Sequence, residues 1–299
     1  MKKYALLLAL ALAASAATAQ TAPKLDIYGK VQMWQESYKS GTTDSYTKLT
    51  NDSSRIGFKL TDDIGDGLTA GFQLETGVAM DAPAATTLGD RISILSLGLK
   101  DVGTLGVGRH KHSVQVLLDD FAIWPTSYAW QADTTHSAQG VRIQNAMFLK
   151  TAPVAGFTAR YEFANAEATD TNNVQGYGLN YANGAFSAAV AYYNNATGTS
   201  TTTNYGAKYK FGSGFTISGI YSDDKVSSVS TTASTIGASQ TFGKATVLAS
   251  YGKINTGDTA SAVGVAYAMN KALTFHARAG WIDATTDITQ YGVGAQYNF

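Results

Sequence analysis

Cysteine is absent from the 299-residue sequence, so a disulfide framework and a cysteine-ligated metal site are both excluded. Charged residues are also scarce, at 15% of the chain compared with about 25% in a typical soluble domain. The 17 Tyr, 12 Phe and 4 Trp exceed what a disordered chain would carry. With 30 Gly, 4 Pro and a mean hydropathy of −0.08, this composition favours an all-β protein over a helical membrane protein.

The N-terminal residues have the pattern of a cleaved secretory signal. Lys2 and Lys3 supply its positive charge, Tyr4 to Ala14 is apolar, and small residues precede the expected cleavage site. The apolar segment is shorter than the about 20 residues that a membrane-spanning helix needs, which disfavours a permanent anchor. We therefore expect a signal peptide over 1–19 and an exported domain over 20–299.

The charge of the exported part gives no sign of a nucleic-acid partner. Of the 22 basic residues, 20 remain once Lys2 and Lys3 are removed, against 22 acidic ones. No apolar run of 18 residues follows the signal, so we expect no membrane-spanning helix. The exported part also lacks a sustained helical stripe of apolar residues, which favours strands throughout.

Apolar side chains instead recur at every second position. In Ile288–Phe299, aromatic and aliphatic residues alternate with small polar ones, and successive side chains of a strand point to opposite faces. Short turn signals alternate with longer polar stretches, as in barrels whose two ends differ. The pattern predicts sixteen antiparallel strands, which begin near Lys24, Ser53, Leu68, Asp90, Thr104, Gln139, Phe157, Asn173, Ala185, Thr203, Phe215, Ser230, Lys244, Thr259, Ala272 and Ile288.

The polar face of these strands decides between a soluble β-sandwich and a membrane barrel. A sandwich buries its apolar faces in a thin core, whereas a wide barrel turns them to lipid and encloses a wet lumen. Here the polar face carries Lys, Arg, Glu and Gln in the middle of strands. We therefore expect a 16-stranded antiparallel transmembrane β-barrel, and a secreted soluble adhesin is the alternative.

Several short motifs now resemble those of the general porin family of Gram-negative outer membranes. Each motif is weak alone, but their order and spacing match the family over essentially the whole exported chain. The motifs are Leu25–Lys30, Ser54–Lys59, Phe72–Glu75, Gly103–Arg109, Arg142–Asn145 and the terminal Phe299. The resemblance implies a homotrimer in outer-membrane lipid, each barrel having its third loop folded into the lumen. Small residues expected to face outward would suit contact with a neighbouring copy, namely Gly29, Ala70, Ser96 and Gly98.

The longest interval between expected strands, 112–138, lies at the position of that third loop. A loop of this length is usually functional. We expect it to fold inward, with an extracellular lobe as the alternative, and it lacks the Pro-Glu-Phe-Gly-Gly tip of many family members. Its acids and tryptophans would line or brace the narrowest point, and they are Asp119, Asp120, Asp133, Trp124 and Trp130.

Basic residues on the inward face would oppose those acids. The resemblance assigns a ladder of four cations at the constriction: Lys30, Arg55, Arg91 and Arg142. The two-residue alternation of the strands also places Lys30, Arg55 and Arg142 on the inward face. For Arg91 the face is less clear, because Leu95 and Leu97 share its alternation. Further residues expected to face the lumen are Lys59, Glu75 and Arg160. Rings of Arg and Lys favour anions, so we expect a modest anion preference, while each Arg could instead form a structural salt bridge.

The expected function is passive diffusion of small hydrophilic solutes and ions through a water-filled pore in the outer membrane. A channel specific for a sugar, phosphate or organic anion is the alternative, suggested by Trp34 and the loop tryptophans. We expect no catalysis, because the chain lacks a GxSxG elbow and a thiol nucleophile. No cofactor is expected, and His110 with His112 reads more simply as polar residues at a loop entrance than as a metal site.

Overall fold

The computed structural model describes residues 22–81, 87–124, 142–165, 173–194 and 200–299. These residues form one antiparallel sheet and a single α-helix, α2 (Ser113–Phe121). The strands are β1 (Lys24–Ser40), β2 (Tyr46–Asn51), β3 (Arg55–Gly65), β4 (Leu68–Gly77), β5 (Ile92–Leu99), β6 (Gly103–Lys111), β7 (Arg142–Thr151), β8 (Phe157–Ala164), β9 (Val174–Asn183), β10 (Phe186–Asn194), β11 (Ser200–Lys210), β12 (Phe215–Val226), β13 (Val229–Phe242), β14 (Ala245–Ile254), β15 (Thr259–Ala268), β16 (Leu273–Asp283) and β17 (Ile288–Asn298).

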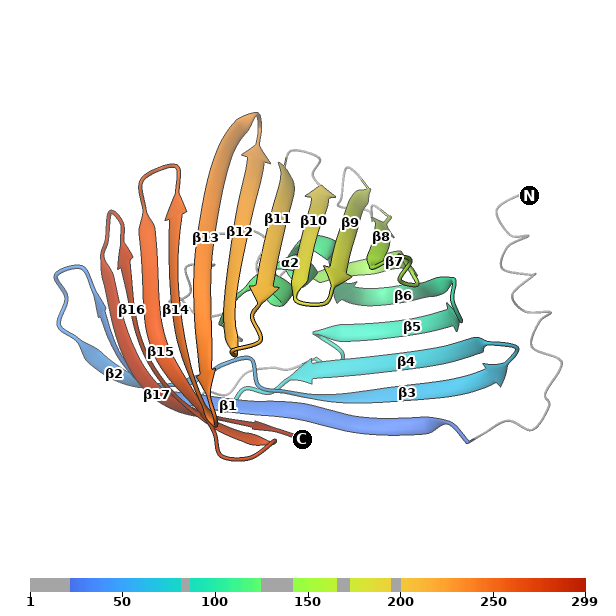
Figure 1. Ribbon diagram of the computed structural model, residues 1–299, viewed down its shortest axis with the longest axis horizontal. Coiled ribbons are helices and arrows are strands. Elements are labelled where there is room, and N and C mark those ends of the chain that lie inside the picture. The colour runs from blue at the N-terminus through green and yellow to red at the C-terminus, as the bar shows by residue number, and fades with distance from the viewer. Residues whose placement is uncertain (1–21, 82–86, 125–141, 166–172, 195–199) are drawn as a thin grey trace.

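The sheet closes on itself as a barrel (Figure 1). Residues 30–40 of β1 pair with β17, and the same strand pairs on its other side with both β2 and β3. Ser53, with a φ of 56°, lies in the interruption between β2 and β3, so these two segments form one barrel strand. The seventeen segments therefore make sixteen barrel strands, which confirms the expected fold.

Alternation along the strands separates an apolar outer face from a polar interior. Leu95 on β5 is 60% exposed and Val293 on β17 is 59% exposed, as expected of residues that face lipid. Gln32 on β1 and Asn204 on β11, on the opposite face, are fully buried inside the barrel. The exposed apolar residues are therefore the lipid-facing surface of the barrel.

Two residues expected to face outward instead face inward. Ser96 lies opposite Gly71 and Gly98 lies opposite Thr69 in the β4–β5 register, on the face away from the exposed Leu95. The phase of β5 was hard to predict because its inward positions begin with two isoleucines, so both faces read as apolar.

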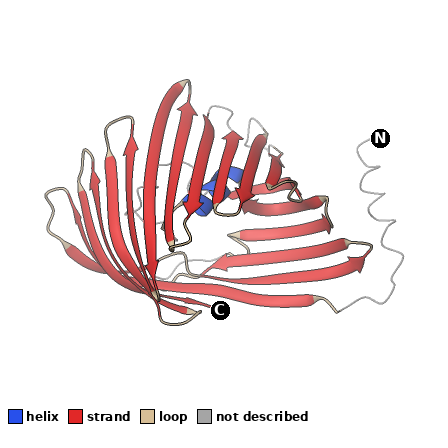
Figure 2. Ribbon diagram, viewed as in Figure 1, coloured by secondary structure: helices blue, strands red, loops and turns tan. Residues whose placement is uncertain are grey.

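The helix is the second departure from the sequence analysis, which expected strands throughout. Nine residues follow β6 directly and coil inside the ring of strands, where Figure 2 shows the helix in blue. Among the described residues, no helix is both long and apolar enough to cross a membrane.

The terminal Phe299 stabilises the seam of the barrel, which is the junction between β1 and β17. Its backbone N–H and C=O form hydrogen bonds of 3.1 and 2.9 Å with Gly29 on β1. The Phe299 ring occupies the space that a Cβ atom on Gly29 would need. The outward face of Gly29 is thus covered by the chain's own C-terminus, and it is not free for a neighbouring copy.

Replacing Phe299 by Ala is expected to weaken the closed barrel. The ring is half exposed, so its loss should cost about 1 kcal/mol, roughly half the value of a fully buried phenylalanine. The measurement is the fraction of refolded protein that migrates as a compact band on unheated SDS gels. Phe242→Ala, at an exposed strand end, is the control, and an equal loss in both variants would contradict the role of the seam.

Candidate functional site

The connection between β6 and β7 enters the barrel and lies against its inner wall. α2 contacts the inward faces of β9, β10, β11 and β12 (Figure 1). Val114, Leu117, Leu118 and Phe121 form an apolar stripe at helical spacing and pack on the alanines of β10. The predicted inward path of the third loop is therefore confirmed for residues 113–124.

A row of glycines on alternate strands makes room for this segment. At each one, a Cβ atom would lie between 2.5 and 3.0 Å from a side-chain atom of the infolded segment. This glycine row comprises Gly178 on β9 beneath Ser113, Gly206 on β11 beneath Phe121, Gly237 on β13 beneath Ile123, and Gly264 on β15 beneath Trp124. The abundance of glycine thus has a local cause, because only glycine lets the loop approach the wall so closely.

A buried carboxylate holds the start of the helix. Glu162 on β8 accepts a 2.9 Å hydrogen bond from the backbone N–H of Ser113 and pairs at 2.5 Å with Arg160. Negative charge at this end is favoured by the helix dipole. His112 is the N-cap, and its Nδ1 accepts from the N–H of Gln115. Burial lowers the pKa of His112 to about 3, so the ring stays neutral and able to accept.

Glu162→Gln should loosen the helix start. The amide keeps the shape but removes the charge from two hydrogen bonds, so we expect a loss of about 1–3 kcal/mol in the free energy of unfolding. Urea titration of the refolded protein, followed by tryptophan fluorescence, measures it. Asp283→Asn on the exposed end of β16 is the control, and equal midpoints for Glu162→Gln and the native protein would contradict the anchoring role.

The metal site that the sequence raised at His110 and His112 gains no third ligand. Within the part of the chain that the structure describes, no group of three or more potential ligands comes together. His112 serves as the helix cap, and the ring of His110 packs against Phe148 with 4.9 Å between centroids.

A basic cluster lies on the opposite wall. Lys30 on β1 and Arg55 on β3 are direct partners in the strand register. The carboxylate of Glu75 on β4 is held between two guanidinium groups, with Nε of Arg55 at 3.4 Å and Nε of Arg91 at 2.7 Å. Lys30 is buried and donates to Gln32 at 2.7 Å. Arg55 and Arg91 thus share the carboxylate of Glu75, whereas the acidic neighbour of Lys30 is the buried Asp52. Three cations against two carboxylates leave a local surplus of positive charge.

Arg91 reaches this cluster although strand parity would place it with Leu95 and Leu97 on the outer face. The residue precedes β5, and its backbone N–H bonds to the carbonyl of Glu75 at 3.1 Å. Because it lies outside the regular strand, its side chain does not follow the alternation that begins at Ile92.

Arg142 completes the group that the resemblance assigned. It is the first residue of β7 and lies opposite Lys111 in the register. Its electrostatic neighbours are Arg91, Glu75, Arg109 and Asp119, so it lies between the Arg91–Glu75 pair and the infolded helix. The structure thus brings together Lys30, Arg55, Arg91 and Arg142, which we call the basic cluster.

The loop acids are partly engaged by nearby lysines. Asp119 pairs with Lys111 at 2.5 Å, and the backbone carbonyl of Asp120 accepts from Lys208. Both aspartates lie on the exposed side of α2, away from the apolar stripe that faces the wall. Asp133, like Trp130, lies outside the described residues.

The remaining predicted lumen residues have different surroundings. Arg160 is tied to Glu162 and lies over the ring of Phe148, with 4.4 Å from its guanidinium carbon to the ring centroid. Lys59 is exposed on the inward face opposite Gln73, and among the described residues it forms no ion pair within 4.0 Å. Arg160 therefore serves the loop anchor, whereas Lys59 offers its charge to the lumen.

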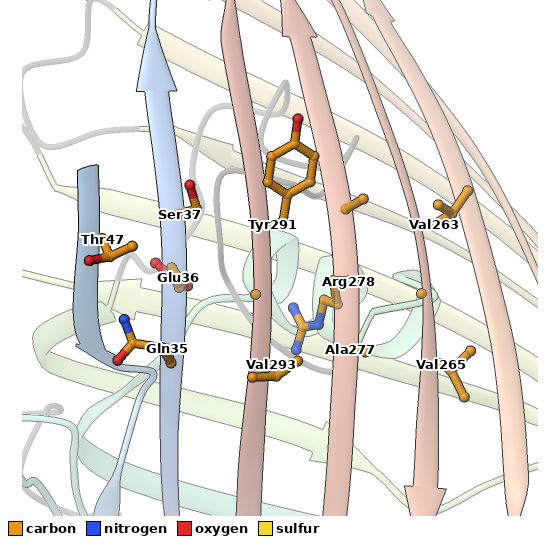
Figure 3. A pocket seen from close by; sticks show the side chains of 13 residues that line it. Gln35, Glu36, Ser37, Thr47, Val263, Val265, Ala277, Arg278, Tyr291 and Val293 are labelled. Atoms are coloured by element: carbon orange, nitrogen blue, oxygen red, sulfur yellow. The ribbon is translucent and has the colours of Figure 1, made fainter. Parts of the chain in front are cut away.

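Arg278, on the inward face of β16, is not among the residues predicted from the sequence. Its guanidinium lies 3.9 Å from the ring centre of Trp34 on β1 and 5.2 Å from that of Trp124. Trp124 also donates to Ser250 at 2.7 Å. An inward arginine together with an inward and a loop tryptophan was the available signal, since cations stack on indole rings. Figure 3 shows Arg278 on β16 and Glu36 on β1, with β17 between them.

A closed barrel with an apolar exterior and a charged interior defines a membrane channel of the outer-membrane type. The sequence matches the Gram-negative porin family over residues 5–299, and the chain belongs to that family. It is 27% identical over 209 residues to the major outer membrane protein P.IB of Neisseria gonorrhoeae, covering 64% of this chain and 56% of that protein. It is 44% identical over 63 residues to the P.IA protein of Neisseria meningitidis serogroup B, covering 21% and 16%. The matches thus span about half or less of these relatives.

Solved structures share the fold at low sequence identity. The anion-selective porin from Comamonas acidovorans has a TM-score of 0.80 and 20% identity, covering 93% of this chain and 100% of that one. OmpT of Vibrio cholerae in its trimer form has a TM-score of 0.70 and 15% identity, with coverage of 93% and 100%.

Proposed function

We propose that this protein is a water-filled channel of a Gram-negative outer membrane, through which small hydrophilic solutes and ions diffuse passively with a preference for anions. The observation that carries the proposal is the basic cluster, whose four cations outnumber the two neighbouring carboxylates, Glu75 and Asp52. Similarity to a porin described as anion-selective gives further support.

The arrangement supplies a transverse field across the pore. Positive charge lies on the wall of β1, β3, β5 and β7, and Asp119 and Asp120 lie on the exposed side of the helix. Walls of low dielectric constant focus such a field and raise the local concentration of counter-ions. The carboxylate of Glu75 is already shared by Arg55 and Arg91, so the surplus charge favours anions.

Planar-bilayer recording of the purified protein tests the proposal. Stepwise conductance increments are expected in KCl, and the reversal potential in a KCl gradient should have the sign of chloride preference. A cation-selective reversal potential would contradict the anion preference, and a complete lack of conductance in folded protein would favour the adhesin.

A substrate-specific channel is the second candidate, and it depends on an aromatic track for sugars. Trp34 is 1% exposed beneath Arg278, and Trp124 is 4% exposed against β14 and β15. Both rings are used for packing, which favours the general pore. Saturable block of the KCl current by one neutral sugar would reverse this preference.

We also propose that residues 1–19 are removed on export, that the mature protein is a homotrimer and that it catalyses no reaction.

One surface feature supports the homotrimer. An open depression of about 540 Å³ on the outer face of β1, β2 and β15–β17 offers polar Gln35 and Ser37 beside exposed Val263 (Figure 3). Polar groups on a lipid-facing wall suit contact with another copy better than contact with lipid. A heat-sensitive trimer band on SDS gels and N-terminal sequencing of the membrane form are the tests.

A further inference from the structure

A second cavity, of about 600 Å³, lies in the lumen at the end of the barrel where the short turns are. Its charged residues are all basic, and hydroxyl groups surround them. The lining includes Lys59, Lys100 and Lys150 together with Thr69, Ser96 and Thr104. No Asp or Glu belongs to this lining. We call this cavity the lysine pocket.

Small residues create the space between the lysines. Lys150 on β7 lies opposite Thr104 on β6, and Thr104 lies opposite Gly98 on β5. Lys59 is four strand positions from Lys150, or about 19 Å along the wall at about 4.8 Å per strand. Lys100, in the turn after β5, lies between the two. The concave wall therefore carries three ammonium groups around an open space.

Direct ion pairs do not neutralise the three ammonium groups in the described part of the chain. All three lysines are exposed, and among the described residues none forms an ion pair within 4.0 Å. The carboxyl of Asp120 interacts electrostatically with Lys150, but Lys208 is its stronger neighbour. Asp26 lies directly opposite Lys59 in the β1–β3 register and pairs with Lys24 at 3.0 Å. The pocket still presents a surplus of positive charge to the pore water, because no carboxylate belongs to its lining.

We propose that the lysine pocket concentrates small multivalent oxyanions, carrying two or three negative charges, at the short-turn mouth of the channel. This inference rests on the proposed pore function. Coulomb energy scales with the product of charges, so a trivalent anion gains about three times as much as chloride from each lysine. Hydroxyl groups of Thr69 and Thr104 can donate to its oxygens. In outer-membrane barrels the short turns are periplasmic, so the pocket faces solutes on that side.

Citrate block of single channels is the test, with acetate as the monovalent comparison and pyrophosphate as a non-carboxylate oxyanion. Recording in 0.1 M KCl keeps the Debye length near about 10 Å. Citrate and pyrophosphate added at the short-turn side should reduce the current at a concentration at least about tenfold lower than acetate does. The combined variant K59Q, K100Q and K150Q should raise the half-blocking citrate concentration at least about tenfold.

Lys271→Gln is the matched control, because Lys271 lies in another short turn and does not line the pocket. It should leave the citrate block unchanged. Block that is equal for citrate and acetate, or unaltered in the triple variant, would overturn the inference while the KCl conductance still upheld the pore. Absence of KCl conductance would instead contradict the proposed function itself.

The lack of native cysteine provides a second test that does not depend on removing three charges. A Lys100→Cys channel should lose part of the citrate block, regain it on modification with a trimethylammonium thiol reagent, and lose more with a sulfonate reagent. Identical block after both reagents would overturn the assignment. The side from which the reagents act also fixes the orientation of the channel in the bilayer.

Discussion

Replacing Arg55 and Arg91 together by glutamine should shift the channel from anion towards cation preference. The substitution leaves Glu75 without the two guanidinium groups that hold it at 3.4 and 2.7 Å, with Arg142 as its remaining cationic neighbour. A unit charge about 7 Å from a permeating ion contributes about 0.6 kcal/mol in water, so removing two charges should change the permeability of each ion roughly sevenfold, downward for chloride and upward for potassium. The measurement is the reversal potential in a KCl gradient.

Glu75→Gln gives the opposite control for the same cluster. Removing the carboxylate frees both guanidinium groups, so anion preference should increase while the pore keeps its shape. Folding of each variant is checked by the heat-dependent shift on SDS gels. An unchanged reversal potential in the folded double arginine variant would exclude the basic cluster as the source of selectivity.

Gly206→Val should narrow the pore by displacing the infolded helix. A Cβ atom at Gly206 would lie 2.7 Å from the ring of Phe121, so α2 must move off the wall and towards the basic cluster. Overpacking of this kind costs about 1–3 kcal/mol. We expect a lower single-channel conductance in KCl and a lower unfolding midpoint in urea.

Gly219→Val is the matched substitution on the neighbouring strand β12. The nearest atom to a Cβ there is a backbone oxygen at 3.7 Å, and the position does not touch the infolded segment. Native conductance is therefore expected for Gly219→Val. If both valine variants conduct alike, contact with the glycine row does not set the position of the helix.

Most of the barrel could be predicted because a two-residue period is a direct consequence of strand geometry. The strands expected near Ser230 and Thr259, where the alternation is weakest, are present as β13 and β15. The helix was missed because Val114, Leu117 and Leu118 form a stripe of barely two turns, too short to stand out in a 3.6-residue pattern. Its position depends on contacts with strands more than fifty residues away.

The candidate site was predictable in its residues but not in its pairings. The residues of the basic cluster follow from strand alternation and from the resemblance. The contact of Arg91 with Glu75 could not be predicted, because Arg91 precedes the regular part of β5. The stacking of Arg278 involves β1, β16 and the infolded segment together. A local sequence pattern cannot predict a contact among three segments that are distant in the sequence.

Because of the glycine row, the helix can dock on the wall only if the strands have paired in the correct register during folding. A slip of one residue in any strand exchanges its two faces. The neighbours of Gly206 and Gly264 along their strands include Tyr205 and Val263, so a slipped strand would present a bulky side chain where Phe121 or Trp124 must lie. Only a barrel whose β9, β11, β13 and β15 are all correctly aligned can accept the loop. A misaligned barrel therefore leaves the infolded segment undocked, and this distinguishes it from the correctly folded channel.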